Sequence, residues 1–173
     1  MTTQKLKYFV SFALYIIVAV LVIMLQSTGL APLNIGTASA VLVLPLAVYA
    51  GFYFGEYAGA VFGLFIGAAL DVFSSTFIYN TVALMVCGFV SGLLISRLFN
   101  RNFAAASVLN VSAAVLYFFV KWLVVYAFSD PAPMFIFVRF TLTSALYTGA
   151  IGVAMFFLLN LMLKWIPVGP TKK

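Results

Sequence analysis

The chain has no histidine, a single cysteine and only three acidic residues among 173. Zinc catalysis and Ser-His-Asp chemistry both depend on side chains that this composition lacks. No glycine-rich phosphate loop ending in lysine occurs either. With Cys87 as the sole thiol, neither an internal disulfide nor a cysteine cluster for a metal can form. The composition therefore argues against an enzyme, and we assign no catalytic residue, metal site or cofactor.

Polar surface is equally scarce. Hydrophobic residues make up 66% of the chain and charged residues 7%, with a mean hydropathy of +1.23. A soluble domain of this kind would have too little polar surface to face water. Because a spanning helix needs about 20 mostly apolar residues, the length suits about six spans. We predict an all-α polytopic membrane protein, a six-transmembrane-helix bundle forming one integral membrane domain over residues 1–173.

The boundaries of these helices follow from breaks in the apolar runs, such as Gly55-Glu56 and the segment from Asp71 to Asn80. We expect helices near 8–25, 36–51, 56–72, 80–98, 104–128 and 135–163. Pro45 falls inside the second of these, where a missing backbone N–H predicts a kink. The alternative is a broken helix that lines a binding site.

Basic residues mark the orientation of the chain. A formal charge of +6 is common among nucleic-acid-binding proteins, but most basic residues here flank apolar stretches, as the positive-inside rule describes. The groups are Lys5 and Lys7, Arg97 and Arg101, and Lys164, Lys172 and Lys173. They all lie on one side if both termini are cytoplasmic. We therefore expect no nucleic acid, and the loop at Arg97 and Arg101 also suits contact with acidic protein or anionic membrane lipid.

Glycine recurs every fourth residue, and the series ends on a carboxylate. Gly59, Gly63 and Gly67 share one face of the third predicted helix, and Asp71 takes the next position. Such a face lets another helix backbone approach closely. One interpretation is contact inside the bundle; the other is a docking face for a partner protein, made of Gly59, Gly63, Gly67 and Asp71.

The fourth predicted helix repeats this spacing at Gly88 and Gly92. These two glycines are candidates for helix packing against the third helix, which would favour the internal interpretation for one of the two grooves.

Three charged residues lie within or beside predicted spans. A carboxylate at membrane depth favours a partner of opposite charge, so Asp71 is a candidate for pairing with Lys121 or Arg139. Asp71 could instead cap the end of its helix, and Lys121 could extend its ammonium to the headgroups. Both alternatives remain open at the level of sequence.

Together these features resemble the rod shape-determining protein MreD family. The resemblance rests on the Leu25-Gln26-Ser27-Thr28 end of the first helix, on the glycine series 59–67 that leads to Asp71 and Ser74, and on Gly88 and Gly92. It covers the first hundred residues; the second half is similar only in hydropathy and length.

The resemblance implies a non-enzymatic scaffold of the cell-elongation machinery in the bacterial cytoplasmic (inner) membrane, with a role in cell shape and peptidoglycan synthesis. MreC would be its partner through transmembrane helix packing, with MreB and the cell-wall synthases bound directly or indirectly. MreD proteins are also similar in fold to the substrate-binding subunits of energy-coupling-factor transporters. The alternative is therefore a vitamin-binding subunit of such a transporter, with Asp71, Tyr79, Asn80 and Lys121 near its ligand.

Overall fold

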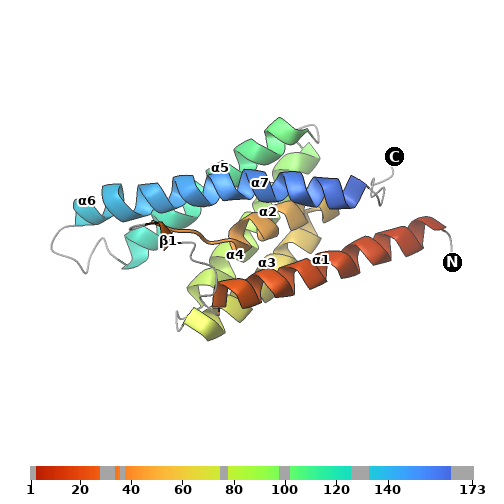
Figure 1. Ribbon diagram of the computed structural model, residues 1–173, viewed down its shortest axis with the longest axis horizontal. Coiled ribbons are helices and arrows are strands. Elements are labelled where there is room, and N and C mark those ends of the chain that lie inside the picture. Colours follow the sequence, from red (N-terminus) through yellow and green to blue (C-terminus); the bar gives the residue numbers. More distant parts are fainter. Residues whose placement is uncertain are drawn as a thin grey trace.

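A computed structural model describes residues 3–27, 34–35, 38–74, 78–97, 102–125 and 133–164. The described chain is almost wholly helical (Figure 1). Its elements are α1 (Thr3–Ser27), β1 (Asn34–Ile35), β2 (Ala38–Ser39), α2 (Val43–Phe54), α3 (Glu56–Ser74), α4 (Tyr79–Arg97), α5 (Phe103–Val125), α6 (Pro133–Ile136), the π-helical turn η1 (Phe137–Leu142) and α7 (Thr143–Lys164). The elements α6, η1 and α7 follow one another without a break and form one long helical run.

Five helical segments of the described chain are long and apolar enough to cross a membrane. They are Val10–Ser27, Glu56–Phe73, Tyr79–Arg97, Phe103–Val125 and Met134–Leu161. This number agrees with a multi-pass membrane protein. The amino end of α1 and the carboxyl end of α7 lie toward the same end of the molecule (Figure 1).

The second helix, α2, is shorter than the other five and lies at the centre of the fold. At 12 residues it is about 18 Å long, well below the hydrocarbon thickness of about 30 Å. Every residue from Val43 to Phe52 is buried, with α3, α4, α5 and α7 around it. A helix that is apolar on all sides is stable only when enclosed in this way. The core of the protein is therefore built around α2.

The start of α2 corrects the prediction of a helix over 36–51. Asn34–Ile35 and Ala38–Ser39 pair instead as two antiparallel strands, and the helix begins at Val43. The low helix propensity of Gly36, Thr37 and Ser39 accounts for the later start. The sequence suggested an earlier start because the residues just before Val43 are apolar, like those that follow it. The backbone N–H of Val41 is bonded to the Thr148 hydroxyl at 3.1 Å rather than to a preceding turn.

The later start also changes what Pro45 does. It is the third residue of α2, so the N–H that proline lacks would have had no partner inside the helix. Pro45 therefore fits the first turn without a kink, contrary to the prediction from sequence. At the other end, Gly55 alone joins α2 to α3, and its φ of +97° is a conformation that glycine adopts at little cost.

The spanning helices form two groups against α2. The helices α3 and α4 pack along most of their length and both contact α2; α5 and α7 form the second pair, while α1 contacts α2 and α3 at the edge of the molecule (Figure 1). Contact between α4 and α5 is sparse by comparison. Several predicted features lie outside the described residues: Thr28, Arg101, the terminal lysines 172 and 173, and residues 126–128 of the fifth helix.

Candidate functional site: the α3–α4 interface and the α4–α5 cleft

The glycine face of α3 is filled by α4. A Cβ atom added at Gly67 would lie 2.5 Å from the Cα of Thr81, and one at Gly63 would lie 2.8 Å from the Cα of Met85. Gly59 would place its Cβ 2.5 Å from the carbonyl oxygen of Gly88. Atoms joined by van der Waals contact lie 3.5–4.0 Å apart, so no side chain fits at these three positions.

These contacts correct the hypothesis that Gly59, Gly63 and Gly67 form an open docking face. A partner helix cannot occupy the groove while α4 lies in it, and the three glycines are part of an internal contact. Gly88 and Gly92 supply the opposite side, as predicted: a Cβ on Gly92 would lie 2.5 Å from the Cα of Glu56. Small residues on both helices bring their backbones together.

Three helices meet where the glycines converge. The Cα of Gly51 on α2 lies 2.5 Å from a Cβ built on Gly59, and Gly88 of α4 contacts the same point. Ser91, one turn further along α4, donates its hydroxyl to the carbonyl oxygen of Val48 at 3.0 Å. The result is one closely packed unit of α2, α3 and α4, in which a buried hydroxyl adds a hydrogen bond between helices.

Asp71 holds the amino end of α4. Its Oδ1 accepts the backbone N–H of Asn80 at 3.1 Å, and its Oδ2 accepts both the N–H of Thr81 at 2.8 Å and the Thr81 hydroxyl at 2.6 Å. The first N–H groups of a helix lack intrahelical partners and carry partial positive charge, which a carboxylate stabilises. Asp71 therefore joins the end of α3 to the start of α4, and the capping role applies to α4 rather than to its own helix.

A group of polar side chains continues from this point to α5. The Tyr117 hydroxyl donates to Oδ1 of Asn80, and the Tyr79 hydroxyl donates to the Tyr117 carbonyl oxygen at 2.7 Å. The two tyrosine rings lie 5.5 Å apart, centroid to centroid. Asp71, Tyr79, Asn80 and Tyr117 thus connect α3, α4 and α5 near one end of the bundle.

The predicted pairing of Asp71 with Lys121 is not formed in the part of the chain that the structure describes, and the pairing with Arg139 stays a prediction. Lys121 is half-buried on α5, one turn beyond Tyr117. Arg139 lies in the π-helical turn with its guanidinium 5.5 Å from the centroid of the Phe135 ring, a cation–π contact. The structure places Tyr79 and Asn80 beside Asp71, as the vitamin-binding alternative requires, but their polar atoms bond to the protein itself.

A second interface, between α5 and α7, escaped the sequence analysis. Asn110 is fully buried and donates its amide to the Gly149 carbonyl oxygen at 3.0 Å, while its Oδ1 has no hydrogen-bond partner among the described residues. A Cβ added at Gly152 would lie 2.6 Å from Cγ of Asn110. The Tyr49 hydroxyl of α2 donates to the Gly152 carbonyl oxygen at 2.6 Å. The sequence feature that could have predicted this interface is an asparagine in an apolar helix together with two glycines on a later helix.

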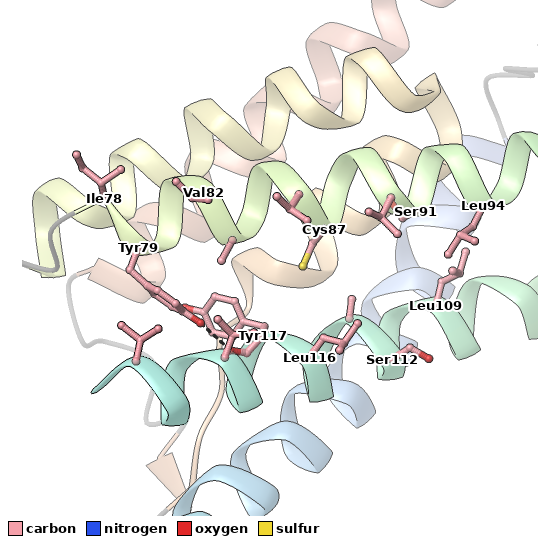
Figure 2. Close-up of a pocket in the computed structure, with 16 residues that line it drawn as sticks. Ile78, Tyr79, Val82, Cys87, Ser91, Leu94, Leu109, Ser112, Leu116 and Tyr117 are labelled. Atoms are coloured by element: carbon pink, nitrogen blue, oxygen red, sulfur yellow. Dashed lines mark hydrogen bonds between the residues drawn. The ribbon is translucent and has the colours of Figure 1, made fainter. Parts of the chain in front are cut away.

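Between the two groups of helices lies a cleft of about 690 Å³, which we call the α4–α5 cleft. Cys87 and Ser91 on α4 face Leu116 and Ser112 on α5, and Tyr79 and Tyr117 lie together at one end (Figure 2). Its lining is almost entirely apolar. The residues are Ile78, Tyr79, Val82, Ala83, Val86, Cys87, Val90, Ser91 and Leu94 from the α4 side, and Leu109, Ser112, Ala113, Leu116, Tyr117, Val120 and Val124 from α5.

Comparison with protein-family models, curated proteins and solved structures finds no match to this chain.

Proposed function

We propose that this protein is a non-enzymatic membrane scaffold of the bacterial cell-elongation machinery, with the role expected from its resemblance to the MreD family. It would bind MreC through transmembrane helix packing and so influence cell shape and peptidoglycan synthesis. MreB and the cell-wall synthases would join directly or through MreC. The setting would be the cytoplasmic membrane, with both termini cytoplasmic.

The observation that carries this proposal is that polar side chains of the helices form hydrogen bonds to neighbouring helices of the same protein. Asp71, Asn80 and Tyr117 hold helices to one another. The residues behind the family resemblance, from Gly59 to Asp71, form a close interface between α3 and α4. Since these groups serve helix contacts, the surfaces left for function are apolar helix faces, which suit another transmembrane helix.

The outer face of α1 is the surface we assign to the partner helix. Ile17, Leu21 and Met24 repeat at helical spacing and are 60%, 56% and 61% exposed. Only 17% of the span Val10–Ser27 is buried, the smallest share among the five spans. Because the glycine groove is closed, α1 at the edge of the bundle offers a long and accessible face beside α3.

The test is affinity purification of the tagged protein from its native membranes in mild detergent, with mass spectrometry of the retained proteins. We expect enrichment of MreC and of cell-elongation proteins. Ile17→Trp together with Leu21→Trp should lower MreC recovery at least fivefold, whereas Phe157→Trp with Leu158→Trp, a matched exposed pair on α7, should not. Absence of MreC from the wild-type eluate would reject the scaffold role, and equal recovery from both variants would reject the α1 surface alone.

The vitamin-binding alternative is favoured by one observation, the meeting of Asp71, Tyr79 and Asn80 at the end of the bundle. It predicts that the purified protein retains a vitamin that can be extracted and identified by mass spectrometry. It also predicts co-purification of paired ATPases and a membrane coupling protein. Either finding would replace the scaffold proposal.

A further inference from the structure

The α4–α5 cleft is a hollow at membrane depth that the protein itself does not fill. Both of its walls belong to helices long and apolar enough to span a membrane. Side chains such as Val86 and Leu116 offer water no hydrogen-bond partner. The bilayer core around the cleft also contains almost no water. The natural occupant of the cleft is therefore hydrocarbon.

The cleft is large enough for a hydrocarbon chain. From Tyr79 to Leu94, α4 rises by about 22 Å, so the volume of 690 Å³ corresponds to a mean cross-section of about 30 Å². A chain one carbon wide, with contacts near 4 Å, needs roughly 13–20 Å². The cleft thus has room for at least one hydrocarbon chain.

A cation is adjacent in sequence to lining residues of α5 at the end of the cleft where the two tyrosines meet. Lys121 is not itself a lining residue, but it comes directly after Val120 and one turn after Tyr117, which both line this end. Within the described part of the chain, its ammonium has no hydrogen-bond or ion-pair partner, although the residue is half-buried. Lysine near the end of a spanning helix extends its stem toward the headgroups, where anionic lipids are attracted to it.

We propose that the α4–α5 cleft binds an anionic phospholipid, with one hydrocarbon chain lying along the cleft and the phosphate group at Lys121. The chain would pack on Val82, Val86 and Leu116, and the hydrogen-bonded pair Tyr79–Tyr117 would form the wall nearest the headgroup. This inference does not rest on the scaffold function, because the cleft and the α1 surface involve different helices.

The test is native mass spectrometry of the purified full chain, incubated with equal amounts of dioleoyl phosphatidylglycerol and dioleoyl phosphatidylcholine. The two lipids share their hydrocarbon chains and differ in headgroup charge. We expect one retained phospholipid per chain, with the anionic lipid favoured at least fivefold. Lys121→Gln should abolish this preference and leave binding of the neutral lipid unchanged.

A pair of bulky substitutions tests the location. Ala83→Phe with Ser112→Phe adds aromatic rings at two points along the cleft and should reduce phosphatidylglycerol retention at least fivefold. Ala150→Phe with Ala154→Phe adds the same volume on the exposed face of α7 and should leave retention unchanged. Circular dichroism and size-exclusion elution check that both double variants fold. If the cleft-filled variant does not fold, the headgroup preference of Lys121→Gln decides.

Each of three lipid-binding results would overturn the proposal: no phospholipid retained by the wild type, equal retention by the cleft-filled and α7 variants, or full headgroup preference in Lys121→Gln. A transmembrane protein that co-purifies with the wild type but not with the cleft-filled variant would assign the cleft to a helix. That result would also overturn the proposal.

Discussion

Gly59 of α3 and Gly88 of α4 contact each other through bare backbone: a Cβ on Gly59 would lie 2.5 Å from the Gly88 carbonyl oxygen. Gly51 of α2 reaches the same point. Three helices can converge here only because none of the three residues carries a side chain. This contact fixes the distance between α3 and α4, and with it the position of the polar group at their end.

Gly59→Ala should therefore destabilise the protein. The added methyl would force apart two helix backbones, which cannot adjust as a flexible side chain can, and overpacking of this kind costs about 1–3 kcal/mol. Thermal unfolding in detergent measures the loss. Gly149→Ala is the matched control, because its Cβ would lie 3.3 Å from Cγ2 of Val111, a side-chain atom. Equal losses in the two variants would show that the α3–α4 contact is looser than described.

This interface was predictable from the sequence because glycines recur at helical spacing on both of the helices that form it. Gly59, Gly63 and Gly67 share a face, and Gly88 and Gly92 provide a second face on the next helix. What spacing could not decide was whether α4 or a partner protein occupies the groove. The occupant depends on how α3 and α4 are joined. Asp71 of α3 caps α4, and a contact between two helices cannot be predicted from the sequence of either helix alone.

The start of α2 and the α5–α7 interface were less accessible for physical reasons. Hydropathy averages over a window, so it could not separate the strand at Ala38–Ser39 from the buried helix that begins at Val43. Asn110 and Gly149 are 39 residues apart and meet only because α5 and α7 are antiparallel neighbours around α2. The α4–α5 cleft likewise results from how two groups of helices are arranged, which no local pattern encodes.

Replacing Asp71 should loosen the start of α4. Asp71→Ala removes the acceptor for two backbone N–H groups and one hydroxyl, and we expect a loss of about 1–3 kcal/mol in the free energy of unfolding. Asp71→Asn should cost less, since the amide keeps one oxygen. Hydrogen exchange of the Asn80 and Thr81 amides gives a local measurement, and both should exchange faster in Asp71→Ala. Unchanged exchange would exclude the capping role.

Tyr117→Phe tests the connection between α4 and α5. The substitution keeps the ring and removes the hydroxyl that donates to Oδ1 of Asn80, leaving a buried acceptor without this donor. We expect a loss of about 1–3 kcal/mol. Tyr79→Phe removes a donor to a main-chain carbonyl in the same cluster and should cost less, because Tyr79 is only half-buried. A Tyr117→Phe protein as stable as the wild type would show that this hydrogen bond contributes little to holding α5 in place.

Gly152 and Asn110 should show strong coupling across α5 and α7. Gly152→Ala places a Cβ 2.6 Å from Cγ of Asn110, so the buried amide must move and its hydrogen bond to Gly149 is strained. Asn110→Ala alone leaves the Gly149 carbonyl without that donor. In the double variant the smaller side chain at position 110 makes room for the new methyl, and the combined loss should fall below the sum of the single losses by about 0.5–3 kcal/mol. Unfolding of all four proteins in one detergent gives the coupling energy. Strict additivity would mean that the two residues do not share the space described, and that α7 approaches α5 for another reason.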